Sequence, residues 1–250
     1  GALAALEDRR LQYFRQSENG GVARARNRGI AECSGQFIAF LDDDDIWHEG
    51  KLATQLRTMT TASLETGLCY TGVRNVRNEL PPQSKLASQS GNLHRALLKR
   101  NFVPLSSLVV RTSLTRKIGG FDENLGAIED WDFLIRASAI SEFAAVSSVF
   151  VDYIDDGEVV EGGGLRRSRH AVRNLEARNA LFRKHRAAFR IEDLAADFLH
   201  ETVRRAVAAR EQKEAARAAA MALRERPTSW ELWSLLAAVA VRDRFFKSSN

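Results

Sequence analysis

The chain has 250 residues, of which 44% are hydrophobic and 28% are charged. This balance is typical of an ordinary globular protein with one large domain or two smaller ones, and it supplies a sizeable core. The net charge of +5 is uneven, because residues 162–250 hold 19 Lys and Arg against 10 Asp and Glu, whereas residues 1–161 hold 18 against 22. A basic excess confined to one segment argues against general nucleic-acid binding.

Cys33 and Cys69 are the only cysteines, too few for a disulfide framework and compatible with a reducing compartment. The opening residues lack the basic leader and apolar stretch of a signal peptide. The longest apolar run of the second half, residues 232–241, is roughly half of the ~20 residues that a spanning helix needs. We therefore expect a cytoplasmic protein, with peripheral attachment to the inner face of the membrane as an alternative.

The first part of the chain alternates between helix-like and strand-like segments. Residues 21–33 indicate a helix, and the unbroken apolar run at 36–41 indicates a central strand covered on both faces. Helical spacing returns at 48–59, and residues 68–73 indicate another strand. This order predicts an α/β layer architecture.

Residues 78–90 are polar and contain two prolines, so we expect a loop that is long enough to cover a site. From about residue 168 the chain is rich in Ala, Arg, Leu and Glu at helical spacing, which predicts three or four helices. A break at Pro227 places the start of the last helix near Trp230. We accordingly divide the chain into residues 1–160 and a helical region at 161–250.

Four aspartates, Asp42 to Asp45, follow directly on the apolar run at 36–41. In an extended segment, Asp42 and Asp44 would point to the same side. Two such charges ~4 Å apart repel by about 1 kcal/mol in water, and by more in a cleft, so they favour a hard divalent cation such as Mg²⁺ or Mn²⁺. The alternative is a solvated acidic turn that caps the next helix. Ligands of α/β sheets bind beyond the carboxyl ends of strands, which is where this run falls.

A second acidic site lies in the segment 118–138. Trp131, Leu134 and Ile135 follow helical spacing, so a helix is expected to begin near Glu129 and to bury this face. Glu129 and Asp130 would then occupy its first turn, where the helix dipole stabilises carboxylates. Either they cap the helix, or Asp130 serves as a general base for an attacking hydroxyl.

Two blocks of the sequence resemble glycosyltransferase family 2. They are NGGVARARNRGIAECSGQFIAFLDDDDIW at 19–47 and NFVPLSSLVVRTSLTRKIGGFDENLGAIEDWDFLIRAS at 101–138, and they stand in the family's order. The resemblance implies a GT-A fold, with a Rossmann-like mixed sheet flanked by helices in residues 1–160 and the helical region after it. It also implies transfer, with inversion, of a sugar from a nucleotide-diphosphate sugar, a UDP-sugar in particular, to a hydroxyl of a glycan or a lipid-linked acceptor.

The same resemblance implies roles for individual residues. Asp42 and Asp44 match the metal-binding DxD motif for Mg²⁺ or Mn²⁺, with Asp44 as the direct ligand, and Asp130 matches the catalytic base. The resemblance also implies contacts to the nucleotide sugar from Arg26, Asn27, Asp42, Asp43 and Glu129. For Arg26 a structural role between helix and sheet stays open.

The family normally opens with a strand, a turn and a second strand that this chain does not contain. The resemblance therefore implies a GT-A fold that lacks its first strands and part of the donor pocket. We expect the chain by itself to bind nucleotide weakly, and tight binding of UDP with Mn²⁺ in a calorimetric titration would refute this expectation.

An alternative hypothesis assigns the chain to a different class of protein, a non-catalytic interaction module. Its basic helical tail would bind an acidic partner, a membrane surface or nucleic acid. A phosphotransferase that uses the aspartates is disfavoured, because the sequence has no Gly-rich phosphate loop that ends in Lys-Ser or Lys-Thr. For the transferase we expect no nucleic-acid partner.

Overall fold

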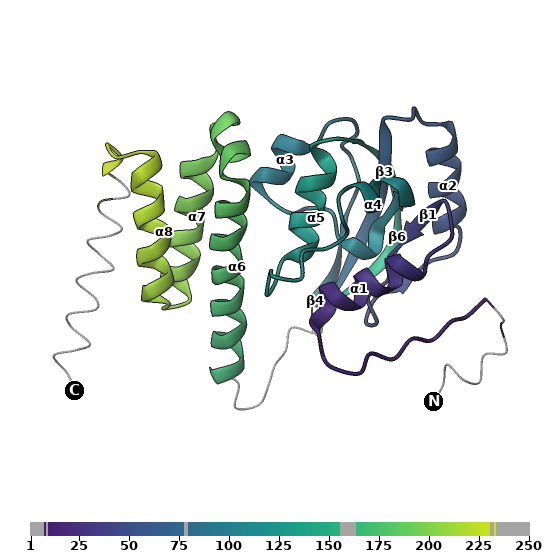
Figure 1. Ribbon diagram of the computed structural model, residues 1–250, viewed down its shortest axis with the longest axis horizontal. Coiled ribbons are helices and arrows are strands. Elements are labelled where there is room, and N and C mark those ends of the chain that lie inside the picture. Colours follow the sequence, from purple (N-terminus) through teal and green to yellow (C-terminus); the bar gives the residue numbers. More distant parts are fainter. Residues whose placement is uncertain (1–7, 9, 78–79, 156–163, 231–232, 234–250) are drawn as a thin grey trace.

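The computed structural model describes residues 8, 10–77, 80–155, 164–230 and 233. Within this part of the chain, strands form one sheet with helices on both sides, and further helices follow it (Figure 1). The strands are β1 (Phe37–Ala39), β2 (Ile46–Trp47), β3 (Thr66–Arg77), β4 (Leu80–Lys85), β5 (Leu108–Arg111) and β6 (Glu142–Asp155). The helices are α1 (Gly21–Glu32), α2 (Lys51–Thr61), α3 (His94–Lys99), α4 (Thr112–Lys117), α5 (Glu129–Ser138), α6 (Gly164–Ile191), α7 (Ala195–Ala208) and α8 (Gln212–Glu225).

The sheet is mixed. Its strands follow the order β1-β5-β3-β6-β2, with β4 paired to β3 beside this path. The long strands β3 and β6 run parallel, and the other pairs are antiparallel. In Figure 1, α2 lies on one side of the sheet, and α3 and α5 lie on the other. The predicted α/β architecture with a mixed, helix-flanked sheet is confirmed.

The apolar run at 36–41 forms a shorter and less central strand than its composition predicts. β1 covers only Phe37–Ala39 and lies at one end of the described strand order, paired to β5. Phe40, which follows the strand, is buried and packs edge-on against Phe121 at a ring-centroid distance of 5.3 Å. The prediction of a central strand was therefore wrong. The run is apolar partly because Phe40, which lies beyond the strand, also packs in the core.

The loop predicted at 78–90 is also partly wrong, because Leu80–Lys85 forms β4. This strand pairs with β3 in a register that opposes Lys85 to Val73. An edge strand tolerates proline, whose missing N–H would break the ladder of a central strand. For this reason Pro81 and Pro82 do not prevent pairing here.

Helix α5 begins at Glu129, as its spacing predicts, and its apolar face is buried. Trp131, Leu134 and Ile135 are at most 5% exposed and belong to the main hydrophobic core. The residue before the helix, Ile128, has a φ of 56°, so the chain enters α5 through a left-handed turn. The left-handed residue therefore sets where α5 begins beside the sheet.

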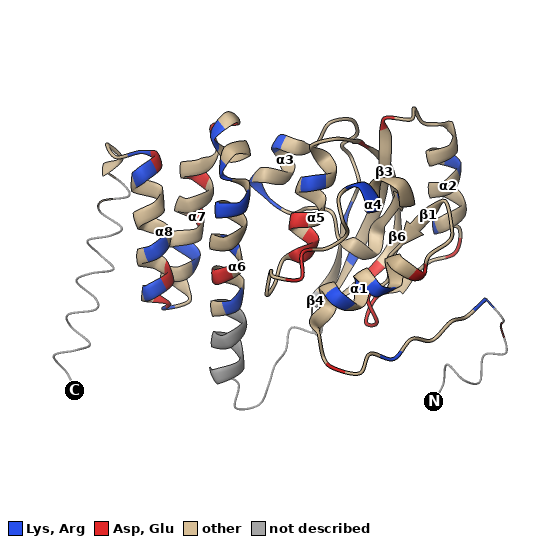
Figure 2. Ribbon diagram, in the orientation of Figure 1, with Lys and Arg blue, Asp and Glu red and all other residues tan. Residues whose placement is uncertain are grey.

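The segment after β6 forms helices, as predicted. α6, α7 and α8 stand side by side in Figure 1, and the core continues into them through Phe198, whose ring lies 5.7 Å from that of Trp131. Figure 2 shows basic and acidic side chains interspersed along these helices. The last predicted helix, near Trp230, falls almost wholly outside the described residues. No described helix is both long and apolar enough to cross a bilayer.

Asp132 ties α5 to α6. Its carboxylate is fully buried and accepts hydrogen bonds from Arg136 at 2.7 Å and from His185 at 2.8 Å. The ammonium group of Lys184 lies 2.9 Å away and also contacts Asp122. Burial alone would raise the pKa of Asp132, but the hydrogen bonds from His185 and Lys184 and the charge of Arg136 outweigh burial and lower it to about 2. The helix that carries Asp130 is thus fixed by charge at its first turn.

Candidate active site

The aspartate run forms a turn between β1 and β2, and this geometry replaces the extended one that the sequence suggested. The N–H of Asp45 donates to the carbonyl of Asp42 at 3.2 Å, which closes the turn. The N–H of Asp42 donates to Ser106 Oγ at 3.1 Å. Asp43 and Asp44 are exposed, whereas Asp42 is partly buried. The argument from alternating strand faces therefore does not apply to Asp42 and Asp44.

Asp45 points into the protein. It is 8% exposed, and its Oδ1 accepts a hydrogen bond from the N–H of Ile154 in β6 at 3.0 Å. Burial raises the pKa of this carboxyl group. Asp45 therefore fastens the acidic turn to the sheet and leaves the other three aspartates on its outer side.

Arg26 joins the two sequence blocks. One guanidinium nitrogen contacts Asp42 at 2.6 Å, and another contacts Glu129 at 2.7 Å. The side chains of Arg26 and Glu129 are only 14% and 10% exposed. Charge-assisted hydrogen bonds of this length, shielded from water, are among the stronger polar contacts in proteins. Residues about 100 positions apart in the chain are thus held in one cluster.

Asp130 lies next to this cluster, in the first turn of α5. Its Oδ2 accepts a hydrogen bond from the side-chain amide of Asn101 at 2.8 Å. Burial, followed by the charge of Glu129, raises the pKa of Asp130, although the contacts with Trp131, Arg26 and Asn101 oppose this rise. A carboxylate with a raised pKa accepts a proton more readily near neutral pH than an ordinary aspartate does.

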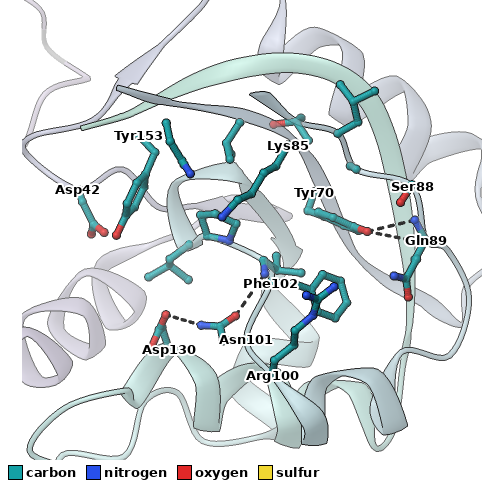
Figure 3. A pocket seen from close by; sticks show the side chains of 18 of the residues that line it. Asp42, Tyr70, Lys85, Ser88, Gln89, Arg100, Asn101, Phe102, Asp130 and Tyr153 are labelled. Carbon is teal, nitrogen blue, oxygen red and sulfur yellow. Dashed lines mark hydrogen bonds between the residues drawn. The ribbon is translucent and has the colours of Figure 1, made fainter. Parts of the chain in front are cut away.

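A cavity of about 780 Å³ connects these groups. The volume lies within the range of roughly 300–1,000 Å³ that small-molecule sites occupy. Asp42 and Asp130 face it from one end, and Tyr70, Gln89 and Arg100 line the other end (Figure 3). Arg26 and Glu129 also line the cavity. The structure therefore brings together Arg26, Asp42, Glu129 and Asp130 as predicted site residues.

Asn27 is directed to a different place. Its side-chain amide donates to the carbonyl of Phe121 at 2.9 Å, and its Oδ1 accepts from the N–H of Phe121 at 2.8 Å. Gly120 has a φ of 69°, and a Cβ there would stand 2.5 Å from Asn27 Oδ1. Asn27 lines a second, shallower hollow over this Gly-Gly turn. Its position fits a clamp on the turn rather than a contact in the main cavity.

The acidic turn has the donor types that suit a divalent ion. Among the described residues, no three His, Cys, Asp or Glu side chains converge on one point. Mg²⁺ and Mn²⁺ do not require such a cage, because one or two carboxylates suffice when water and phosphate oxygens complete the shell. Asp44 has an exposed carboxylate, and Asp42 uses only Oδ1 in its contact with Arg26. Asp42 and Asp44 thus retain carboxylate oxygens of the type that such an ion takes.

Sequence reasoning did not single out Asn101, Tyr70, Lys85 or Arg100, all of which line the cavity. Asn101 belongs to the second quoted block, so its position in that block was the only signal available. Tyr70 and Arg100 lie outside both blocks, in segments with no distinctive spacing. Lys85 lies in the segment 78–90 that was expected to cover a site, but no pattern marked this residue within it. Tertiary packing alone brings them to the cavity.

The family model described as glycosyltransferase-like family 2 matches residues 3–202. The chain belongs to this family. Among curated relatives, an uncharacterized glycosyltransferase of Rickettsia typhi is 25% identical over 150 residues, and YwdF of Bacillus subtilis, another uncharacterized glycosyltransferase, is 29% identical over 146 residues. These matches cover 58% and 56% of this chain. A pre-mycofactocin glycosyltransferase of Mycobacterium tuberculosis is 29% identical over 153 residues, or 57% of this chain.

A solved structure has a similar fold. It is a mannosyltransferase from Pyrobaculum calidifontis in complex with GDP-Man and Mn²⁺, with a TM-score of 0.50 and 17% sequence identity. The match covers 90% of this chain and 61% of that protein. The family 2 chain thus has a GT-A-like α/β fold followed by helices. It spans about half or less of the curated relatives, since the matches cover 45%, 54% and 32% of their lengths.

Proposed function

We propose that this family 2 chain forms part of an inverting glycosyltransferase, which moves a sugar from a nucleotide-diphosphate sugar to an acceptor hydroxyl. The observation that carries the proposal is the Arg26 cluster, because it holds Asp42 and Glu129 beside Asp130 on one cavity. An acidic turn, a partly buried arginine and a carboxylate of raised pKa supply what such a transfer needs from the protein.

For the donor, we propose a nucleotide sugar bound at the Asp42 end of the cavity. The mannosyltransferase of similar fold was solved with GDP-Man and Mn²⁺, which supports a nucleotide sugar and a divalent metal. We keep a UDP-sugar as the specific expectation for this chain. Asp42 and Asp44 would hold Mg²⁺ or Mn²⁺, and Asp43 is the exposed neighbour available to the nucleotide. When bound, the ion would neutralise charge on the departing diphosphate.

For the chemical step, Asp130 is the proposed base. Its carboxylate would accept the proton of the acceptor hydroxyl as that oxygen forms a bond to the anomeric carbon. The bond from this carbon to the diphosphate oxygen breaks at the same time, and the nucleoside diphosphate leaves with the electron pair. Attack from the face opposite the leaving group inverts the anomeric carbon. Asn101 would orient the Asp130 carboxylate toward the hydroxyl.

In this proposal the transferase part comprises residues 1–160, and residues 161–250 form the helical region that supports α5. The rival interaction module would need a free basic surface. Several basic side chains of the described helices instead pair with acids, as Arg186 and Arg190 do with Glu225 at 2.7 Å. Glycans and lipid-linked glycans remain the proposed acceptors, with peripheral membrane association as a further proposal.

A donor screen on the full-length protein tests the function. UDP-, GDP- and TDP-sugars are compared for transfer and for slow hydrolysis, with Mg²⁺ or Mn²⁺ present. Asp130→Asn is expected to lower kcat by about 10²–10⁴-fold, because general base catalysis contributes that much, while nucleotide binding is retained. Asp193→Asn, at an exposed aspartate that does not line the cavity, is the matched control. Undiminished turnover by Asp130→Asn would remove the base assignment.

A further inference from the structure

We infer that the end of the cavity beyond Asp130 binds an acceptor that carries an anionic group, a phosphate or a carboxylate, on Lys85 and Arg100. This inference rests on the proposed transferase function, and it adds the chemical class of the acceptor. The two ends of the cavity differ in charge: carboxylates gather around Arg26 at one end, whereas Lys85 and Arg100 have no carboxylate partner among the described residues.

The three cationic side chains that line the cavity differ in whether a carboxylate of the protein pairs with them. Arg26 is neutralised by Asp42 and Glu129 at 2.6 and 2.7 Å. Lys85 and Arg100 line the same cavity and, within the described part of the chain, neither forms an ion pair with a carboxylate. Their charges are thus available to a ligand.

Lys85 and Arg100 enter the cavity from opposite walls. Lys85 is the last residue of β4, held by its pairing with Val73 of β3. Arg100 follows the end of α3, where its N–H donates to the carbonyl of Ala96 at 3.2 Å. In Figure 3, the Lys85 side chain reaches in from the sheet side, and the Arg100 side chain reaches in from the helix side. The two cations thus flank the cavity, and the proposed anion would lie between them.

The placement of Arg100 connects this anion to the reacting hydroxyl. Arg100 directly precedes Asn101, whose side chain is bonded to the proposed base Asp130 at 2.8 Å. Figure 3 places Asp42 and Asp130 at one end of the cavity and Arg100 at the other. A donor whose diphosphate lies at the Asp42 end would leave the Arg100 end to the acceptor. The anionic group therefore belongs near the sugar that carries the attacking hydroxyl.

The rest of this end suits the ring of a sugar. Tyr70 and Phe102 pack edge to face with ring centroids 6.3 Å apart. The phenolic group of Tyr70 donates to the carbonyl of Gln89 at 3.0 Å, which holds the segment after Lys85 against β3. Fixed aromatic edges beside a guanidinium group combine apolar contact with bidentate recognition of a phosphate or a carboxylate.

Binding titrations on the full-length protein test the inference, and they need no knowledge of the natural acceptor. ¹⁵N-labelled protein is titrated by NMR with methyl β-glucoside, methyl β-glucuronide and methyl β-glucoside 6-phosphate. We expect at least one anionic sugar to bind about tenfold or more tightly than the neutral one, as charge-assisted contacts predict. The two anionic arms distinguish a carboxylate acceptor from a phosphorylated one.

Variants locate the effect. Arg100→Met and Lys85→Met should each abolish the anionic preference, whereas Lys99→Met, an exposed neighbour that does not line the cavity, should retain it. Equal binding of all three sugars, or no binding of either anionic sugar, overturns the inference. So does a loss of UDP or GDP binding in Arg100→Met and Lys85→Met, because the cations would then serve the donor diphosphate. Absence of any nucleotide binding by the unmodified protein would instead refute the proposed function.

Discussion

Asn101 donates its side-chain amide to Asp130 Oδ2 at 2.8 Å, and this contact orients the carboxylate proposed as the base. The other end of the Asn101 side chain is also engaged, since its Oδ1 accepts from the N–H of Val103 at 3.2 Å. The amide is therefore fixed on both sides. Asp130 in turn has one oxygen bonded to Asn101 and faces the cavity.

Asn101→Ala should shift the acid limb of the pH–activity profile. The hydrogen bond from Asn101 favours the charged form and lowers the pKa of Asp130, although burial raises this pKa overall. Its loss should raise the pKa further, so that kcat/KM rises only at higher pH than in the unmodified protein. We also expect kcat to fall about tenfold near neutral pH, which corresponds to a net hydrogen bond of ~1.4 kcal/mol.

The measurement is kcat/KM against pH for both proteins with the donor found in the screen. Asn124→Ala, at an exposed asparagine beside Asp122, is the control that should leave the profile in place. A profile of Asn101→Ala that overlays the unmodified one would show that the contact does not tune Asp130.

The sequence predicted the parts of this site that are local and left out those that depend on packing. The start of α5 at Glu129 followed from helical spacing, because an amphipathic helix records its buried face in its own residues. The geometry of Asp42–Asp45 stayed open between an extended segment and an acidic turn, since four like residues carry no periodicity. Asn101 and Arg100 could not be connected to Asp130 by any spacing, because the path from α3 to β5 decides where they lie.

The two misread strands have related explanations. β4 was hidden by Pro81 and Pro82, which are common in loops and are tolerated at the edge of a sheet. β1 was predicted to be central because an apolar run indicates that its residues are buried but does not indicate which elements bury them. In this protein part of that burial comes from the ring of Phe40, which packs against Phe121 outside the strand.

Arg26→Met should destabilise the protein through the carboxylates it leaves behind. Asp42 and Glu129 would face each other's charge without their shared partner, and Glu129 is largely buried. We expect the free energy of unfolding to fall by about 1–3 kcal/mol, the range for losing hydrogen bonds to charged groups. Urea unfolding at neutral pH measures this loss.

Two further variants separate this effect from a simple change of charge. Arg28→Met removes an arginine from the same helix, where its exposed contact with Glu32 should contribute no more than about 0.5 kcal/mol. Glu129→Gln introduced into Arg26→Met should recover part of the loss, because it removes one of the two unpaired charges. Equal stability of Arg26→Met and Arg28→Met would contradict the bridging role.

Asp132→Asn should weaken the attachment of α5 to α6 in a manner that depends on pH. The pKa of Asp132 is lowered from 3.8 to about 2, so its charged contacts stabilise the fold above about pH 4 and are lost as pH falls through about 2. A lowering of this size corresponds to roughly 2 kcal/mol. The difference in free energy of unfolding between the two proteins should therefore be full at pH 7 and shrink toward pH 2.

Urea titrations at pH 7, 5, 4 and 3 follow this difference. Asp197→Asn is the control, because the Asp197 side chain is 69% exposed and pairs weakly with Arg226 at 3.5 Å. It should change the free energy of unfolding by less than about 0.5 kcal/mol at every pH. A destabilisation of Asp132→Asn that stays constant down to pH 3 and below would indicate lost packing, and would remove the electrostatic explanation.

Lys51, the first residue of α2, should destabilise the fold at neutral pH, whereas Asp132 stabilises it. It is 1% exposed, its ammonium group lies 4.1 Å from the centre of the Trp47 ring, and it donates to Gln55 at 2.8 Å. Burial lowers its pKa from 10.5 to about 8. The unfolded chain therefore binds this proton more tightly than the folded protein does, so Lys51 opposes folding at pH 7 and ceases to do so as pH rises through about 8 to 10.5.

Comparison with Lys51→Met isolates this effect. The free energy of unfolding of the unmodified protein, minus that of Lys51→Met, should rise by about 2–3 kcal/mol between pH 7 and pH 10.5. Burial raises the pKa of the neighbouring Cys69 to about 11. The free energy of unfolding of both proteins therefore falls above pH 9, where the thiol ionises in the unfolded chain, and this contribution largely cancels in the difference. Urea unfolding across this range measures the difference, and a value that does not change with pH would show that folding does not lower the pKa of Lys51.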